Sequence, residues 1–309
     1  MTPRRLLLLA LVALALPGCS SSAQSGDIAD RKVRVTTTTN FITDTVRQIG
    51  GDRVAVTGLM GPGVDPHLYK ASAGDVRTLR DADVIAYGGL ELEGKMADLL
   101  DELAERQTTV AVTKDIPRGR LLEPPGDAAE QVDPHVWFDA TNWMIVARTI
   151  AATLKEKDPG SAALYDRNLA AYERELQQTD RYVQRRIASI PRERRILVTS
   201  HDAFAYFGRR YGLEVAAIQG ISTAAEATTG DVQRVARLIA DRDVPAVFVE
   251  SSVPRQTIDA VLAAARRLGA DARVGTELFT DAAGDDGTPE GTYVGMLRAN
   301  ADRIAQGLR

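Results

Sequence analysis

Short apolar segments alternate with longer amphipathic segments along most of this 309-residue chain. The short segments are rich in β-branched residues, as in RKVRVTTTT (31–39), and this composition predicts strands. In the longer segments apolar residues recur every three or four positions, which predicts helices packed on a sheet. Regular alternation of this kind is typical of an α/β fold in which mainly parallel sheets are flanked by helices. We expect strands at 31–39, 54–59, 84–87, 108–112, 196–199, 214–218, 244–250 and near 274, and helices at 40–49, 72–81, 93–106, 141–157, 204–211, 231–241, 256–268 and 291–308.

One helical segment is much longer than the others. Residues 161–190 contain neither proline nor glycine, and their apolar residues recur at helical spacing. About thirty residues at 1.5 Å each give a rod of roughly 45 Å, which is longer than one lobe is wide. An ordinary surface helix is the alternative, but this length favours a connector between two lobes. We therefore predict an N-terminal lobe at 31–159, a connecting helix at 160–191 and a C-terminal lobe at 192–309.

The N-terminus does not share this pattern. Arg4 and Arg5 precede an apolar run at 6–16, which is short for a membrane span and typical of a signal peptide. The run ends in Leu-Pro-Gly-Cys, which resembles the lipobox of bacterial lipoproteins. We predict that residues 1–18 are removed, that Cys19 is lipidated and that 19–30 form a tether. The alternative for Cys19, a lone buried thiol, is disfavoured by its position.

Composition narrows the possible functions. The length exceeds what one ordinary core fills, so two lobes are expected. The formal charge is −4 and the basic residues form no block, which disfavours nucleic acid as a partner. Aromatic residues make up only 5 %, which disfavours a sugar-binding site. The signal sequence and predicted anchor indicate a protein that works outside the cytoplasm, on a membrane surface.

The three histidines are the main chemical signal in the sequence. His67 and His135 each follow Asp-Pro, and His201 directly follows the predicted strand at 196–199. In open α/β sheets, ligands bind beyond the carboxyl ends of the strands. Proline restricts its own φ and the conformation of the residue before it, so each Asp-Pro-His turn is stiff before any ligand binds. We predict that the three imidazoles converge on one metal ion.

Three neutral imidazoles suit a borderline divalent cation such as Zn²⁺, and a closed site needs a fourth ligand. Asp281, after the last predicted strand, is the best placed candidate, and Glu250 is either a rival ligand or a residue that supports one. Asp285 and Asp286 share the loop of Asp281 and are by default solvated. Spacing alone does not separate these candidates. The aspartates of the two repeats, Asp65 and Asp133, either orient the imidazoles by hydrogen bonding or form the turns.

Several longer motifs now become significant together. They are GPGVDPHLYKASAGDV, DPHVWFD, TSHDAFAYFGRRYGL, GISTAAEATTGDV, VFVESSVPRQT and LFTDAAG, in this order. Over nearly all of the chain after the signal sequence they resemble the metal-binding solute receptors of bacterial ABC transporters, the cluster A-I group for zinc and manganese. The resemblance implies two α/β lobes joined by one long helix, with the metal buried between them. It also implies that the receptor delivers the ion to a membrane permease driven by a cytoplasmic ATPase, and we expect it to do so as a monomer.

Carried over residue by residue, the resemblance makes His67 and His135 the ligands from the first lobe. His201 and Asp281 are then the ligands from the second. Manganese receptors of this group often have a glutamate where this chain has His201, which favours Zn²⁺. The His-rich acidic loop of many zinc receptors is absent here. Because a His₃Asp site binds zinc more tightly than manganese in the Irving–Williams order, we expect Zn²⁺, with Mn²⁺ as the alternative.

Two other classes of function remain as alternatives. An extracellular zinc hydrolase needs an open coordination position and a general base. The chain has no HExxH motif, and its candidate ligands are far apart in sequence. A receptor for a nutrient other than a metal, or an adhesin, would contain no stoichiometric metal.

Overall fold

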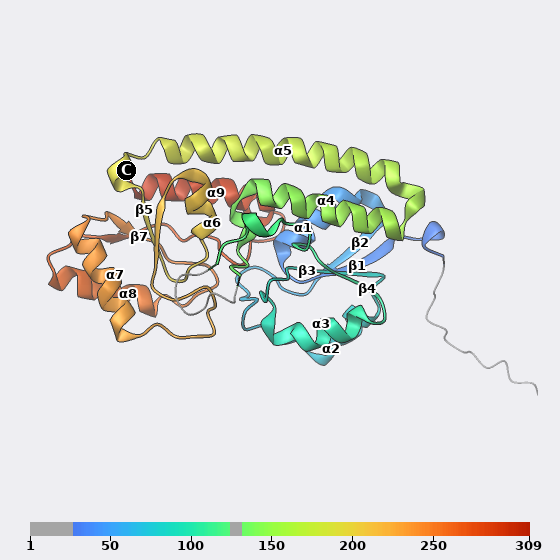
Figure 1. Ribbon diagram of the computed structural model, residues 1–309, viewed down its shortest axis with the longest axis horizontal. Coiled ribbons are helices and arrows are strands. Elements are labelled where there is room, and N and C mark those ends of the chain that lie inside the picture. Colours follow the sequence, from blue (N-terminus) through green and yellow to red (C-terminus); the bar gives the residue numbers. More distant parts are fainter. Residues whose placement is uncertain (1–26, 124–131) are drawn as a thin grey trace, which may run out of the picture.

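The computed structural model describes residues 27–123 and 132–309. The predicted signal peptide, Cys19 and most of the predicted tether lie outside these ranges. Figure 1 shows two α/β lobes side by side, with one long helix running over both. Within the described ranges, no helix combines the length and the apolar character that crossing a bilayer requires.

The N-terminal lobe is built on a four-stranded parallel sheet. Its strands follow the order β2-β1-β3-β4. Neighbouring residues of β3 face opposite ways: Val84 and Ala86 pack with α1 and α4, whereas Ile85 packs with α2 and α3. The lobe is therefore a three-layer sandwich. Its elements are β1 (Val33–Thr37), α1 (Asn40–Gly50), β2 (Val54–Gly58), α2 (Ala73–Arg80), β3 (Val84–Tyr87), α3 (Ala97–Ala104), β4 (Thr108–Ala111) and α4 (Ala140–Lys157).

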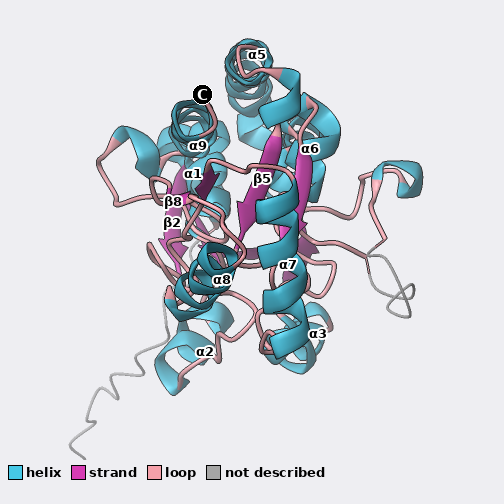
Figure 2. Ribbon diagram, turned by 90° about the vertical axis from the view of Figure 1, so that its left-hand side faces the viewer, coloured by secondary structure: helices cyan, strands magenta, loops and turns pink. Residues whose placement is uncertain are grey.

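The C-terminal lobe repeats this plan with the strand order β6-β5-β7-β8. Figure 2, in which this lobe faces the viewer, shows α7 and α8 in its lower part and α6 and α9 in its upper part. One face of the sheet, including Val198 and Val247, packs with α7 and α8. The other face, including Leu197 and Phe248, packs with α6 and α9. The elements are β5 (Ile196–Thr199), α6 (Ala205–Tyr211), β6 (Glu214–Ala217), α7 (Thr229–Asp241), β7 (Ala246–Val247), α8 (Gln256–Arg267), β8 (Arg273–Val274) and α9 (Tyr293–Gly307).

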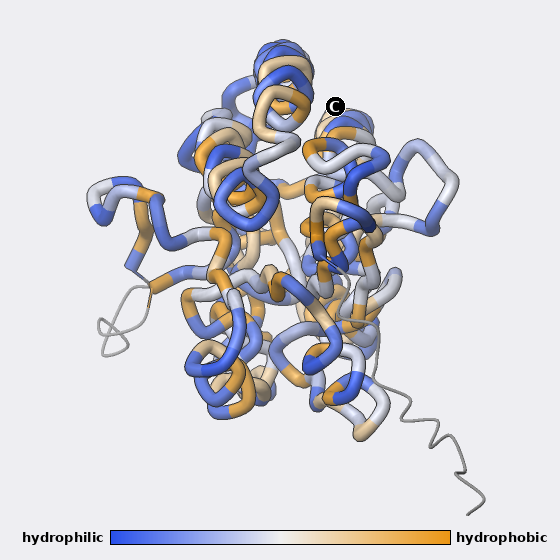
Figure 3. The backbone as a smooth tube through the Cα atoms, turned by 90° about the vertical axis from the view of Figure 1, so that its right-hand side faces the viewer, coloured by the Kyte–Doolittle hydropathy of each residue, from blue (hydrophilic) through white to orange (hydrophobic). Residues whose placement is uncertain are grey.

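The long helix α5 (Ala162–Ala188) confirms the predicted connector. It packs against α1 and α4 of the first lobe and against α9 of the second. Hydrophilic and hydrophobic residues both occur around this helix, the uppermost one in Figure 3, as expected for a helix with one buried face. The aromatic rings of Trp143 and Tyr293, one from each lobe, stack with their centroids 4.8 Å apart. One hydrophobic core thus continues through both lobes on the α5 side.

Two predicted elements differ from the structure. The segment 244–250 contains only the two-residue strand β7, followed by an isolated bridge between Glu250 and Leu278. The neighbouring strand β8 pairs with β7 over only two residues, and one further bridge follows at Leu278. The sheet therefore ends irregularly beside the loop that carries Asp281. The predicted helix 93–106 begins later, at α3. The Glu93 carboxylate accepts hydrogen bonds from the N–H groups of Gly88 and Gly89, which holds this segment as a turn.

Candidate metal centre

The two Asp-Pro-His tripeptides form the same local turn. In the first, the backbone N–H of His67 donates to Asp65 Oδ1 at 2.8 Å. In the second, the N–H of His135 donates to Asp133 Oδ1 at 2.9 Å. An aspartate that accepts the N–H two residues later is a common turn-forming arrangement. The repeat in the sequence therefore marks two stiff turns that present a histidine toward the space between the lobes.

The second lobe presents its side chains from the segments that follow β5 and the bridge at Leu278. His201 lies two residues after β5, and Asp281 follows the bridge at Leu278. His67, His135, His201 and Asp281 are all buried, and one nitrogen or oxygen atom of each lies within 4.8 Å of the corresponding atoms of the others. The structure therefore brings together the four residues that the sequence singled out.

The imidazole Nε2 atoms face one another across this cluster. His67 Nε2 lies 3.4 Å from His135 Nε2. The two carboxylate oxygens of Asp281 lie 3.5 Å from His135 Nε2 and 3.4 Å from His201 Nε2. Three nitrogens and one carboxylate thus surround a common point. These donor atoms, at these short separations, are what a tetrahedral cation site requires.

Carboxylates behind two of the rings set their orientation. Asp133 Oδ1 lies 2.7 Å from His135 Nδ1, and Glu250 makes a short contact with His201 Nδ1. Glu250 also accepts the backbone N–H of Ser200 at 2.6 Å and that of His201 at 3.0 Å. Such a contact holds the ring in place and directs Nε2 toward the metal position. Glu250 therefore lies behind His201, outside the four side chains that converge.

His67 lacks this support. In the part of the chain that the structure describes, no carboxylate is hydrogen-bonded to its ring, because Asp65 contacts the backbone instead. Asp65 uses its second oxygen to accept from Thr223 of the other lobe at 2.6 Å. Of the two roles considered for these aspartates, Asp133 takes both and Asp65 takes only the turn-forming one.

The site has an uneven distribution of charge. Burial lowers the pKa of His67 to about 4, although Asp281 partly opposes the shift. Burial acts in the same direction on His135, but Asp133 and Asp281 outweigh it and raise its pKa to about 9. Burial alone would raise the pKa of Asp281, yet the neighbouring histidines, led by His201, hold it well below its usual range. The Asp281 carboxylate is therefore ionised over the whole physiological pH range.

Two buried polar atoms at the centre of the cluster have no hydrogen-bond partner among the described residues. They are His201 Nε2 and Asp281 Oδ1, on side chains that are 0 % and 1 % exposed. Buried polar atoms are rarely left unpaired, because losing their hydration costs free energy. A cation bound between them would satisfy both atoms. The residues present therefore fit a divalent metal ion.

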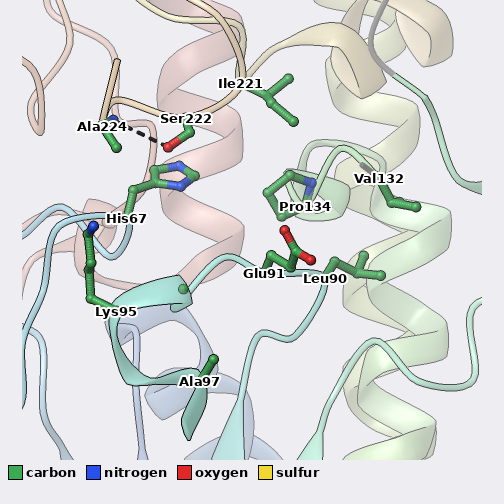
Figure 4. Close-up of a pocket in the computed structure, with 11 residues that line it drawn as sticks. His67, Leu90, Glu91, Lys95, Ala97, Val132, Pro134, Ile221, Ser222 and Ala224 are labelled. Carbon is green, nitrogen blue, oxygen red and sulfur yellow. Dashed lines mark hydrogen bonds between the residues drawn. The ribbon is translucent and has the colours of Figure 1, made fainter. Parts of the chain in front are cut away.

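One residue of the cluster, His67, borders a cavity. The cavity has a volume of about 430 Å³ and is walled by segments of both lobes, including Glu91 and Pro134 of the first and Ser222 of the second (Figure 4). Asp285 and Asp286, the other acidic candidates on the last loop, are exposed and do not belong to the cluster.

Sequence reasoning missed some of the supporting contacts. The hydroxyl of Ser252 lies 3.1 Å from Asp281 Oδ2. Trp137 packs edge-on against the His135 ring and donates its indole N–H to the carbonyl of Thr280, next to Asp281. Trp137 lies only two residues after His135, and this closeness in sequence could have indicated that it packs beside the His135 ring. Nothing in the sequence pointed to the pairing of Thr223 with Asp65.

Two parallel-sheet lobes, a long helix over both and a buried site between them define a solute-binding receptor. The chain matches a family model over residues 35–307, and it belongs to that family, the periplasmic zinc-uptake complex component A (ZnuA). This is a family of receptors that serve ABC uptake systems outside the cytoplasm, and not of enzymes. The hydrolase alternative is thereby removed.

Individual relatives match almost the whole chain. The manganese-binding lipoprotein MntA of Bacillus subtilis is 44 % identical over 295 residues, covering 96 % of this chain and 95 % of that protein. The zinc-binding protein TroA of Treponema pallidum is 46 % identical over 280 residues, covering 91 % and 90 %. The solved structure of periplasmic TroA superposes with a TM-score of 0.87, at 45 % identity, over 90 % of this chain and 99 % of that one. These matches confirm the predicted fold and class of receptor.

Proposed function

We propose that this receptor captures Zn²⁺ with His67, His135, His201 and Asp281, and delivers it to a membrane permease that a cytoplasmic ATPase drives. The observation that carries the proposal is a pair of buried atoms at the centre of the cluster, His201 Nε2 and Asp281 Oδ1, to which the described residues offer no hydrogen bond. Each lobe supplies two of the four ligands, so a bound ion links the lobes directly.

Three features favour zinc as the cargo. A set of three imidazoles and one carboxylate, converging within 4.8 Å, matches the tetrahedral preference of Zn²⁺. At a given site of this type zinc binds more tightly than manganese. The relative TroA, which shares 46 % identity with this chain, is named a zinc-binding protein.

Manganese is the second candidate. The relative MntA is named a manganese-binding lipoprotein, and its 44 % identity to this chain is close to that of TroA. Manganese favours more oxygen ligands. Asp281 supplies two carboxylate oxygens that both face imidazole nitrogens, so binding through both oxygens would raise the oxygen count of the site.

The rest of the chain follows from this role. We propose that Cys19 carries the lipid that anchors the receptor, that 19–30 form its tether, and that it acts as a monomer. Several acyl chains give stable anchoring, whereas one chain is marginal. We propose lobe boundaries at 31–159 and 192–309, with 160–191 between them, because each range contains one four-stranded sheet and α5 lies between the two ranges.

Metal analysis tests the proposal. The receptor, purified without added metal and then titrated, is expected to bind one equivalent of Zn²⁺ and to prefer it in direct competition with Mn²⁺. Zinc at about a hundredfold excess over Kd should stabilise the fold by about 2.7 kcal/mol, because it binds only the folded state. The variant Asp285→Ala, on the same loop as Asp281 but exposed, should bind zinc normally. Absence of stoichiometric metal would refute the function, and tighter binding of Mn²⁺ would reverse the choice of ion.

A further inference from the structure

The loop between β6 and α7, residues 218–228, contacts the neighbours of two of the proposed ligands. At its base it is hydrogen-bonded to the segment around His201. The N–H of Gln219 donates to the carbonyl of Ser200 at 2.9 Å, and the N–H of Asp202 donates to the carbonyl of Gly220 at 3.2 Å. The start of this loop is therefore held in a fixed position relative to His201.

Further along, the same loop reaches the other lobe. Thr223 donates its hydroxyl hydrogen to Asp65 Oδ2 at 2.6 Å, across 158 positions of sequence. The other oxygen of Asp65 accepts the backbone N–H of His67 at 2.8 Å. Figure 4 shows Ser222 and Ala224, the sequence neighbours of Thr223, beside the His67 ring at the cavity. Asp65 thus connects His67 to the second lobe.

This contact lies on the cavity side of the site. On the α5 side the lobes share one hydrophobic core and further hydrogen bonds, such as the pair between the Asn40 side chain and the backbone of Ala283 at 2.8 and 2.9 Å. On the cavity side, the hydrogen bond from Thr223 to Asp65 acts beside His67, whose ring no carboxylate supports in the described chain. The position of His67 therefore depends on Asp65 and on what holds Asp65.

We propose that Thr223 and Asp65 form an inter-lobe clasp that keeps His67 on the bound ion and so sets the rate of metal release. The proposal rests on the function proposed above and adds Thr223 as a positioning residue. When the clasp is intact, the His67 turn stays against the ion. When it opens, His67 is the first ligand to leave, and the ion is exposed to the cavity.

Substitution of Thr223 tests the clasp. Thr223→Val keeps the shape of the side chain and removes the hydroxyl, while Thr223→Ser keeps the hydroxyl and is the matched control. Release of Zn²⁺ from each loaded receptor is measured by stopped flow into excess chelator, and association is measured separately. Because hydrogen bonds to charged groups are among the stronger ones, Thr223→Val should release zinc roughly tenfold faster, with association within about twofold of the unmodified protein. Thr223→Ser should behave as the unmodified protein.

A double-mutant cycle with His67→Ala separates positioning from a general structural role. If Thr223 acts through His67, the effect of Thr223→Val on release should disappear when His67 is already absent. The same acceleration in the His67→Ala background would overturn the proposal. So would equal release rates for Thr223→Val and Thr223→Ser while both bind zinc, a result that would leave the receptor function intact. Failure of the unmodified protein to bind zinc would instead refute the function itself.

Discussion

The two lobes share one sheet topology but present their ligands in different ways. In the C-terminal lobe His201 lies two residues after β5 and Asp281 lies three residues after the bridge at Leu278, and Glu250 and Ser252 contact these two side chains. In the N-terminal lobe His67 lies in a loop nine residues after the end of β2, and only its backbone is held. His135 lies between these extremes, since Asp133 supports both its ring and its backbone.

This difference indicates that His67 and the other three residues of the cluster have different roles. Three of the four proposed ligands are held by neighbouring side chains without any ion, and such preorganisation reduces the entropy lost on binding. The fourth, His67, is 6 % exposed and borders the cavity. We infer that the supported ligands supply most of the affinity, whereas His67 controls access and release.

The largest expected loss of zinc affinity follows from replacing a residue whose side chain is held by its neighbours. His201→Ala should weaken zinc binding by roughly a hundredfold or more, because it removes a ligand and also leaves the buried carboxylate of Glu250 without its imidazole partner. Asp281→Ala should have a comparable effect. Competition with a chromophoric chelator measures both affinities. Affinities within about threefold of the unmodified protein would show that these residues do not bind the ion.

The substitution His67→Ala should have a smaller effect. We expect zinc affinity to fall at least about tenfold, but by less than in His201→Ala, because three fixed ligands remain. The same competition assay applies. An equal or larger loss at His67 would contradict this difference in roles, and an unchanged Kd would remove His67 from the site.

Removal of a supporting carboxylate should have the next largest effect. Glu250→Gln should weaken zinc binding about tenfold, since the amide supports the His201 ring less well than the carboxylate does. Glu277→Gln, an exposed glutamate in the same lobe, is the matched control and should bind zinc as the unmodified protein does. Identical affinities for the two variants would show that Glu250 does not tune the site.

Proton titration of the metal-free receptor compares the unsupported and supported rings directly. His67 should stay neutral down to about pH 4, whereas His135 should keep its proton up to about pH 9. With only three histidines in the chain, NMR of the imidazole protons can resolve each titration. Two histidines that both titrate near pH 6.5, the unperturbed value, would contradict the difference between the rings.

These pKa values also predict how the stability of the metal-free fold depends on pH. His67 has a folded pKa below its unfolded value, so the unfolded chain binds more protons and stability falls as pH decreases from about 6.5 to about 4. His135 has a folded pKa above its unfolded value, so its contribution is complete below about pH 6.5 and is lost as pH rises through about 9. Urea unfolding at several pH values measures both trends. Replacement of His67 should reduce the loss of stability that occurs between about pH 6.5 and pH 4.

The fold was largely predictable because its elements are encoded locally. The β-branched runs and the long segment without proline or glycine predicted most strands and α5. The prediction was least accurate where side chains from elsewhere decide the geometry. Glu93 accepts hydrogen bonds from Thr38, 55 residues away, and from the N–H of Gly88, and residues 94–96 form a 3₁₀ turn before α3 begins. Strand β7 is short because its partner strand β8 has only two residues.

The sequence by itself singled out the three histidines, because histidine is scarce here and two of the three follow Asp-Pro, which stiffens a turn. Asp281 was one of several acidic candidates until the resemblance to the receptor family selected it. Tertiary structure decided what joins those turns. The support of His201 by Glu250 and the clasp between Thr223 and Asp65 connect positions 49 and 158 residues apart. The first contact depends on the pairing of β5 with β7 inside the C-terminal lobe, and the second on how the two lobes pack against α5. Both are properties of the packed chain and not of any local pattern.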